Sequence, residues 1–471
     1  MKYKDNVTMN YPLISEYIES IKSEEDNFKE LKYLRPILSD DGLPIMSSGN
    51  FAVVFKMWDE RERRHYAIKC FTKDQPLRAE SYQLIADELK KVSSSYIPYI
   101  RYYEKELFVD TGQTDESEFP VLLMDWVEGE SLDKYIHNNI EDRFQLNMLA
   151  FRFSQLAEWL IGQPFAHGDL KPDNILVLSN SALTLVDFDG MYVPAMYEQN
   201  AREVGSPDFS HPMRTEKNFD EHIDDFSIIS ILLSLKLLSL DSSLLNRFGA
   251  SDRLLLSRTD YQNITKCKLI KEIYPSLNSE VNKLINLLVK TLTDGSLTLT
   301  AKDVSINLEM KQFSTLINDE DYKNYYWDKD NVIYSRDGKK ILGCNDETNH
   351  DYRVSNGCET ICDNAFVGQC QMLENVELPD GLIAIGKNAF STCYMPSVVL
   401  PKTLKVIGDG AFSYNPFLYQ ICIPDSVEYI GKGIFEGCND YFIIYVEPGT
   451  RSKFEKMLPD FKNRLSEGMI W

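Results

Sequence analysis

The last third of the chain contains a short repeat that leaves few folds open to it. Four segments match one another, ICDNAF, IGKNAF, IGDGAF and IGKGIF, and they begin at residues 361, 385, 407 and 430. Successive starts therefore lie 24, 22 and 23 residues apart. A unit of this length is too small to bury its own apolar face, so neighbouring units must stack and share one core. The repeat predicts a solenoid over residues 330–471 that ends in a C-terminal cap.

The segments that precede the repeats share a second feature. ELPDGL, VLPKTL and CIPDSV stand ahead of the last three, and each proline ends a short strand because it donates no ladder hydrogen bond. Over roughly residues 330–450 these units resemble the leucine-rich repeats of the BspA-like type. The resemblance implies a domain that binds a protein, a substrate or a partner. A domain that only caps or stabilises its neighbour is the alternative.

The cysteines favour a reduced protein. There are nine, an odd number, and Cys358, Cys362 and Cys370 lack the paired CxxC spacing of a zinc site. Cys370, Cys393 and Cys438 fall at or near the position after the repeated Ala-Phe pair, where the BspA-like family often has cysteine. The N-terminal segment MKYKDNVTMNYPL contains no apolar run of the kind that a secretory signal has. We therefore expect free thiols packed in the core and a cytoplasmic location.

The net charge argues against two classes of partner. Seventy-two acidic residues against 50 basic ones give a formal charge of −22, which repels the phosphates of nucleic acids and of anionic membranes. We expect neither as a partner. The longest apolar stretch, roughly Ile228 to Leu240, contains Lys236 and is shorter than the ~20 residues that span a bilayer. It is expected to be a buried helix.

The order of patterns along the chain predicts the architecture. At 471 residues the chain is too long for one ordinary core. Residues 1–42 are expected to form a helical extension, because their apolar residues recur at helical spacing. Residues 43–128 are strand-rich and residues 129–325 are mainly helical, so a smaller strand-rich part precedes a larger helical part. The fold class is therefore α+β, followed by the solenoid.

A group of polar residues in the two lobes carries the chemistry of phosphoryl transfer. In HGDLKPDNILV, which starts at residue 167, Asp169 offers a carboxylate to an attacking hydroxyl and Asn174 offers a carboxamide to a metal ion. Lys171 lies between them and can neutralise charge on a moving phosphoryl group. Downstream, LTLVDFDG places Asp187 at the end of an apolar strand as a second metal ligand. Upstream, HYAIKCF places Lys69 in a strand where it can hold phosphates.

In order and spacing, these residues resemble the signature of the protein kinases from about residue 44 to 315. The resemblance implies a bilobal domain, with residues 43–128 as the small lobe and hinge and residues 129–325 as the large lobe. The resemblance implies that Asp169 is the catalytic base, Lys171 the catalytic-loop lysine of Ser/Thr kinases, and Lys69 the strand lysine. ATP and Mg²⁺ are the implied cofactors, with Asn174 and Asp187 as the magnesium ligands.

The same resemblance implies further contacts. Lys69 is expected to pair with Glu80, and Glu88 is the weaker candidate. IDDFS is similar to the start of the helix that anchors the catalytic loop, through Asp224. GSPDFSHP, which starts at residue 205, is similar to the end of an activation segment.

FPVLLMDWVEGESL is similar to the hinge of the family. There Met124 would be the gatekeeper, and the backbone of Asp125 and Val127 would meet adenine. The residues expected to bind the cofactor are Gly49, Ala52, Val54, Ala67, Lys69, Met124, Asp125, Val127, Asn174 and Asp187.

Several positions depart from the family pattern. The phosphate-covering loop keeps Gly49 and Val54, but Ser47 and Ala52 stand where glycines are usual, so we expect nucleotide binding to persist with less backbone freedom. Gly168 replaces the arginine of the HRD motif. Because that arginine normally pairs with a phosphorylated activation loop, control by loop phosphorylation is not expected.

Two more departures lie downstream. Asp189 stands in place of the DFG glycine, where a further carboxylate could assist a cation or distort the site. His211, Pro212 and Met213 occupy the APE region, so the stabilising ion pair of its glutamate is expected to be absent. Departures of this kind are similar to those of atypical bacterial kinase-like proteins.

The sequence favours an active, atypical Ser/Thr kinase whose repeats recruit a protein substrate or partner. A pseudokinase scaffold that binds nucleotide without turnover is one alternative, and a kinase of small molecules is the other. The sequence does not indicate an oligomeric state.

Overall fold

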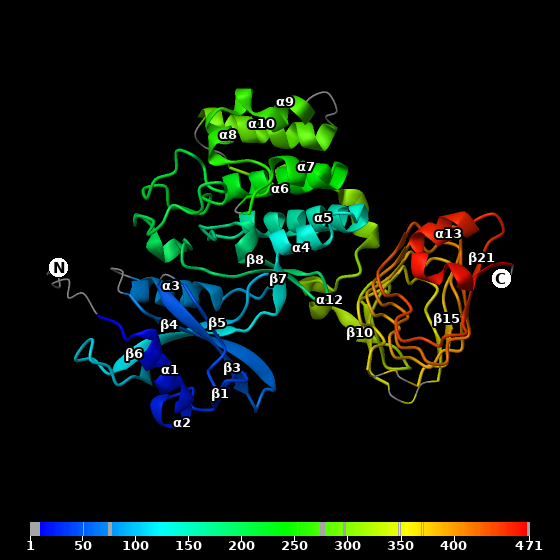
Figure 1. Ribbon diagram of the computed structural model, residues 1–471, viewed down its shortest axis with the longest axis horizontal. Coiled ribbons are helices and arrows are strands. Elements are labelled where there is room, and N and C mark those ends of the chain that lie inside the picture. The colour runs from blue at the N-terminus through cyan, green and yellow to red at the C-terminus, as the bar shows by residue number, and fades with distance from the viewer. Residues whose placement is uncertain are drawn as a thin grey trace. The chain divides into compact units, whose positions relative to one another are not determined.

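The computed structural model describes residues 10–468 except 50, 74–77, 252, 274–277, 295–297, 347, 349, 369 and 371. It confirms the predicted class, with an antiparallel sheet, a helical region and a repeat solenoid in chain order. The chain divides into two compact units, and the main boundary lies between Ile306 and Asn307. Figure 1 colours the first unit from blue to green and the second from yellow-green to red.

The small lobe is built on one antiparallel sheet. Its order is β1-β3-β4-β6-β5, and β2 pairs with β3. The central strand β4 is buried at six of its eight positions, because the core covers both of its faces. The strands are β1 (Leu34–Pro36), β2 (Met46–Ser48), β3 (Ala52–Asp59), β4 (Arg64–Phe71), β5 (Ile100–Phe108) and β6 (Glu118–Asp125).

The N-terminal extension packs onto this sheet. Helix α1 (Ile14–Lys22) buries Tyr17 and Ile21 in the core that also contains Phe55, and the Tyr17 hydroxyl donates to the Phe71 carbonyl at 2.8 Å. A short helix, α2 (Glu24–Asn27), follows. The extension was predicted to be mostly helical, and residues 34–36 within it form β1 because they pair antiparallel with the end of β3. Residues 1–9 lie outside the described part of the chain.

The large lobe is a helical bundle around α6 (Asp225–Leu240), the predicted buried helix, which is buried from its first residue to Ser239. Lys236 inside it forms an ion pair with Glu280 at 2.5 Å, and this partner explains a lysine in an apolar helix. No helix in the described ranges has the length and hydrophobicity needed to cross a membrane. The other helices of this lobe are α4 (Leu132–Asn138), α5 (Arg143–Ile161), α7 (Ser243–Phe248), α8 (Arg258–Gln262), α9 (Lys268–Ile273), α10 (Ser279–Asp294) and α11 (Ala301–Val304).

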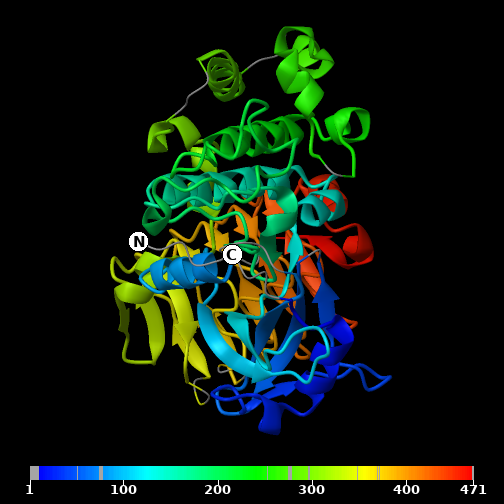
Figure 2. The ribbon, with the colours of Figure 1, turned by 90° about the vertical axis from the view of Figure 1, so that its left-hand side faces the viewer.

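A short antiparallel sheet carries the segments that bear the candidate site. It consists of β7 (Gly129–Ser131), β8 (Ile175–Leu178) and β9 (Leu183–Leu185), in the order β7-β8-β9. In Figure 2 the strands of the small lobe, in blue and cyan, and the helices of the large lobe, in green, form the two parts of the first unit. Helix α3 (Arg78–Leu89) belongs to the small lobe and follows β4.

The second unit is the predicted solenoid, and its repeats form two ladders of parallel strands. Register aligns Ile361, Ile385, Ile407 and Ile430 in the first ladder. Its sheet consists of β10 (Tyr325–Trp327), β11 (Val332–Ser335), β12 (Lys340–Cys344), β14 (Thr360–Ile361), β16 (Ala384–Ile385), β18 (Val406–Ile407) and β20 (Tyr429–Ile430). The other side has β13 (Asp351–Arg353) with β15 (Asn375–Glu377), and β17 (Ser397–Val399), β19 (Gln420–Ile423), β21 (Ile443–Val446) and β22 (Leu465–Glu467).

The repeated phenylalanines form the column that holds the solenoid together. The rings of Phe366, Phe390 and Phe412 stack, with centroids 5.0 and 5.6 Å apart and planes 9° from parallel. Phe435 continues the column at 6.4 Å. Helix α13 (Arg451–Met457) buries Phe454 in the same core as part of the predicted cap.

The boundary between the units differs from the predicted end of the large lobe at residue 325. Residues after Ile306 pack on the solenoid, because the Thr315 hydroxyl donates to Asp363 at 2.6 Å and Asp321 forms an ion pair with Lys340 at 2.7 Å. Helix α12 (Asp319–Lys323) and β10 therefore belong to the first turn of the solenoid.

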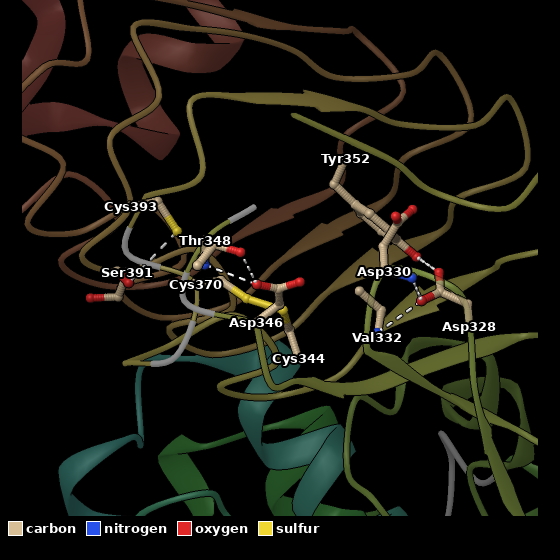
Figure 3. The surroundings of a disulfide bond; sticks show 10 residues. All are labelled: Asp328, Asp330, Val332, Cys344, Asp346, Thr348, Tyr352, Cys370, Ser391 and Cys393. Carbon is tan, nitrogen blue, oxygen red and sulfur yellow. Dashed lines mark hydrogen bonds between the residues drawn. A yellow bond between two sulfur atoms is a disulfide. The ribbon is translucent and has the colours of Figure 1, made fainter. Parts of the chain in front are cut away.

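The expectation that all nine cysteines are free thiols is wrong for two of them. Cys344 and Cys370 form a disulfide between β12 and the following turn, and Figure 3 shows it beside Cys393, whose thiol stays free. Stacking of adjacent turns brings the two residues together across 26 positions of sequence. Cys393 and Cys438 are free and pack in or against the solenoid core, as predicted for them.

Candidate active site

A cavity of about 500 Å³ lies between residues of the two lobes. The small lobe lines it with the loop before β3 and with β3, β4 and β6, and the large lobe with the segments around β8 and β9. Phe51, Leu122 and Val186 add apolar surface. The predicted site residues that line it are Gly49, Ala52, Val54, Lys69, Met124, Asp169, Lys171 and Asp187.

Asp224 anchors the loop that carries the candidate base, as predicted. Its carboxylate, buried at the start of α6, accepts the backbone N–H groups of His167 and Gly168, the latter at 2.9 Å. Burial raises the pKa of this carboxyl above its usual value, although the two N–H groups act in the opposite direction. The position of residues 167–169 thus depends on one buried side chain.

Asp169 is held from three sides. The Lys171 ammonium lies 2.8 Å from Oδ2, the backbone N–H of Ser206 donates to Oδ1 at 2.7 Å, and the Asn174 amide donates to Oδ2 at 3.3 Å. Burial alone would raise the pKa of Asp169, but the hydrogen bond and charge of Lys171 together with Ser206 outweigh it and lower the pKa below its usual value. The carboxylate is therefore ionised and aimed by its neighbours, as a proton acceptor requires.

Asn174 and Asp187 lie on segments tied to each other. The Val186 N–H donates to the Asn174 carbonyl at 3.0 Å, and Asp187 follows with φ 65° and its carboxylate half exposed in the cavity. Asn174 itself is buried and is not part of the cavity wall. Carboxylate and carboxamide oxygens are ligands that suit Mg²⁺, which usually takes few protein ligands and completes its shell with phosphate and water. Among the described residues no group of three or more His, Cys, Asp or Glu side chains gathers as a metal site.

Lys69 does not pair with the residue predicted for it. Its ammonium forms an ion pair with Asp189 and lies 3.5 Å from Asp187 Oδ1. The hydroxyl of Tyr82, from α3, also donates to the Asp189 carboxylate. Glu80 on the same helix is exposed, with no ion pair to Lys69.

Glu88, the weaker candidate, pairs with Lys91 at 2.7 Å. The prediction failed because the family resemblance places the partner on this helix but does not fix the rotation of the helix, and the carboxylate of Asp189 lies beside Lys69.

Comparison with known protein families identifies the family to which the chain belongs. A profile described as protein kinase domain matches residues 43–302, more than half of the chain. A profile described as BspA type leucine rich repeat region matches residues 345–452 in six copies. The chain belongs to the protein kinase family.

Individual kinases are similar only over part of the chain. Human citron Rho-interacting kinase is 27% identical over 203 residues, which cover 41% of this chain and 9% of that protein. A probable serine/threonine-protein kinase of Dictyostelium discoideum is 27% identical over 158 residues, or 33% and 32% of the two chains. The type 3 cAMP-dependent protein kinase of Saccharomyces cerevisiae is 25% identical over 191 residues, or 39% and 45%. The chain thus spans less than half of each of these relatives.

The hinge of this kinase differs in detail from the prediction. Met124 lines the cavity, as a gatekeeper does, and Ala67 pairs with it from β4. Ala67, Asp125 and Val127 are not part of the cavity wall. The Asp125 N–H donates to the Tyr99 carbonyl at 3.0 Å, so that N–H group is engaged within the sheet.

The kinase replaces the missing APE ion pair by hydrogen bonds to backbone. Met213, where the glutamate would stand, is exposed. Instead, the Arg258 guanidinium donates to the Pro212 carbonyl at 3.0 Å, and the backbone N–H of Arg258 donates to the Asp208 carboxylate at 2.6 Å. The end of the activation segment is thereby attached to α8 without an acidic side chain at residue 213.

The glycine in place of the HRD arginine is required by a close approach of two loops. Gly168 has φ 83°, and a Cβ there would lie 1.9 Å from the Gly190 carbonyl oxygen. No side chain fits, so the change from arginine follows from the position of the DFDG segment.

Sequence reasoning missed Tyr82 and Glu203, which also line the cavity. Tyr82 lies on α3 two residues after Glu80, and its aromatic ring looks like an ordinary core residue in sequence. Glu203 stands before the GSPDF motif in a segment with no regular pattern, so no sequence signal pointed to it.

Proposed function

We propose that this kinase transfers the γ-phosphoryl group of ATP to a Ser or Thr hydroxyl of a protein. The observation that carries the proposal is the ionised, three-sided setting of Asp169 beside Lys171 at a cavity that also contains Lys69 and Asp187. These are the groups that phosphoryl transfer needs, and they come together from three separate segments of the chain.

Each residue has a distinct role in this proposal. Asp169 accepts the proton of the acceptor hydroxyl, while Lys171 stabilises charge on the transferred group. The hydroxyl oxygen bonds to the γ-phosphorus, the bond from that phosphorus to the β–γ bridging oxygen breaks, and ADP leaves. Asp187 and Asn174 would hold Mg²⁺, which when bound neutralises phosphate charge.

The solenoid is proposed to recruit a protein. Support comes from exposed aromatic side chains on consecutive turns. The rings of Tyr394 and Phe417 meet edge to face at 5.2 Å, and Tyr419 and Tyr441, 22 residues apart, are exposed as well. Exposed aromatic groups of this kind are enriched where proteins bind proteins.

A cytoplasmic location also remains part of the proposal.

A second candidate function is a nucleotide-binding scaffold without turnover. One observation favours it, because Lys69 is engaged by Asp189 and not by a helix α3 glutamate. A lysine held in this way is not free to contact phosphates until the ion pair opens.

Incubation with labelled ATP and Mg²⁺, wild type beside Asp169→Ala, tests the proposal. Label on Ser or Thr of a protein in the wild type alone, located by mass spectrometry, is the expected result. Nucleotide binding with no transfer would favour the scaffold, and transfer only to small hydroxyl compounds would favour a small-molecule kinase. Transfer that persists in Asp169→Ala would contradict the assignment of the base.

A further inference from the structure

The catalytic loop has no arginine of its own, yet an arginine reaches it from elsewhere. Arg214 lies after the activation segment, and its Nη1 donates to the Gly168 carbonyl at 2.9 Å. Gly168 is the position that cannot hold a side chain, since its Cβ would meet Gly190. The guanidinium therefore contacts Gly168, the residue that replaces the HRD arginine and directly precedes Asp169.

A second glycine makes room for this contact. Gly205 has φ 73°, and a Cβ there would lie 3.2 Å from Arg214 Nη1 and 3.1 Å from the Gly168 carbonyl oxygen. The next residue, Ser206, donates its N–H to Asp169. The activation segment thus crosses the catalytic loop at two adjacent contacts, one on residue 168 and one on residue 169.

The arginine projects from a fixed base. The Arg214 N–H closes a turn on the His211 carbonyl at 2.9 Å, and Arg258 holds the Pro212 carbonyl of the same turn. Ser227 of α6 donates to the Phe209 carbonyl just before it. A side chain that starts from an anchored turn loses less entropy when it holds a second segment in place.

The charges around Arg214 favour this position. Its Nε and Nη2 are buried without a hydrogen-bond partner among the described residues, and burial lowers the pKa of the guanidinium. Asp224 and Asp169 oppose that effect most strongly among the surrounding carboxylates. These are the anchor of the catalytic loop and the proposed base itself.

We propose that Arg214 is a positioning residue that orders the catalytic loop and the activation segment against each other, in the role that a phosphorylated residue and the HRD arginine share in other kinases. The part of the inference that concerns catalysis rests on the proposed phosphoryl transfer. The ordering itself does not. Because the arginine belongs to the chain and carries its charge permanently, the site is assembled without phosphorylation of the segment.

The test compares Arg214→Met and Arg214→Lys with the wild type and with Lys217→Met, which removes an exposed charge three residues away. In Arg214→Met, hydrogen–deuterium exchange of peptides covering residues 166–171 and 203–210 should be faster than in the wild type. In Lys217→Met it should stay near the wild-type level, and in Arg214→Lys it should lie between the other two. Autophosphorylation or labelling of a generic protein acceptor should show kcat reduced on the order of 10- to 100-fold in Arg214→Met, with little change in the KM for ATP. Thermal unfolding of each variant checks that the fold persists.

The outcomes separate the inference from the proposed function. If the wild type transfers no phosphate, the proposed function fails, and exchange alone then decides the role of Arg214. Unchanged exchange in Arg214→Met, or an unchanged kcat in an active enzyme, would overturn the inference. Wild type treated with a phosphatase, and shown by mass spectrometry to carry no phosphate between residues 187 and 214, should keep its exchange pattern and activity. Loss of either on that treatment would also overturn it.

Discussion

The ammonium of Lys69 forms an ion pair with Asp189, the residue that occupies the place of the DFG glycine. Both side chains are largely buried, and Tyr82 donates a hydrogen bond to the same carboxylate. The residue that departs from the family pattern is thus the one that holds the lysine expected to contact phosphates. Through Asp189, the lysine proposed to bind phosphates is thus connected to α3.

Asp189→Gly should therefore tighten binding of ATP with Mg²⁺, because it frees Lys69. We expect a gain on the order of 1 kcal/mol, roughly fivefold in Kd, because ATP no longer has to open the Lys69–Asp189 ion pair. Isothermal titration calorimetry measures it, and Asp189→Asn, which removes the charge but keeps the shape, should give a similar gain. Weaker binding in both variants would show that Asp189 helps to hold the cation instead.

Asp187→Ala should abolish the Mg²⁺ dependence of nucleotide binding, because it removes the exposed carboxylate of the predicted metal pair. The affinity for ATP would then be equal with and without Mg²⁺ in a fluorescence titration. Asp169→Asn is the matched control: it should keep the Mg²⁺-dependent affinity while reducing the transfer rate by about 10²- to 10⁴-fold. A magnesium effect that survives in Asp187→Ala would place the cation elsewhere.

Gly168→Ala should destabilise the kinase unit by about 3 kcal/mol or more, because an added Cβ meets the Gly190 carbonyl and the backbone has positive φ. Differential scanning fluorimetry would detect this as a lower melting temperature. Gly112→Ala serves as the control, since a Cβ there has open space and no positive φ. Equal melting temperatures of the two variants would contradict the close approach of residues 168 and 190.

Asn415→Leu should destabilise the solenoid by about 1–3 kcal/mol, because the buried amide donates to the carbonyls of Phe390 and Phe412 at 2.8 and 2.9 Å. The equivalent positions of the neighbouring repeats hold Cys393 and Cys438, and the Cys438 thiol contacts the Phe412 carbonyl at 3.0 Å. Asn415→Cys should therefore lose less stability than Asn415→Leu in urea denaturation. Equal losses would mean that the hydrogen bonds do not matter there.

Alkylation of the denatured protein without a reductant should label seven thiols, because nine cysteines less the Cys344–Cys370 pair leave seven. After reduction all nine should react. Intact mass measurement distinguishes the two results, and nine labelled thiols before reduction would show that the bond does not form in the protein as prepared.

The pattern of motifs, with the family resemblance that it carries, was enough to predict the two kinase lobes, the solenoid and eight of the residues that line the cavity, among them Gly49 and Asp187. It sufficed because each of these features depends on a local pattern: a repeat of 22 to 24 residues, a loop with Asp169 and Asn174 five apart, and a strand that ends at a carboxylate. Asp224 was predicted from the resemblance of IDDFS to the start of the helix that anchors the catalytic loop.

Tertiary structure decided what spacing does not encode. The rotation of α3 set Tyr82, and not Glu80, against Asp189, and the approach of two loops explained why residue 168 has no side chain. The stacking of turns paired Cys344 with Cys370, and residues 307–325 joined the solenoid because their partners lie within it. In each case the contact joins segments distant in sequence, so its energy depends on packing that no local pattern contains.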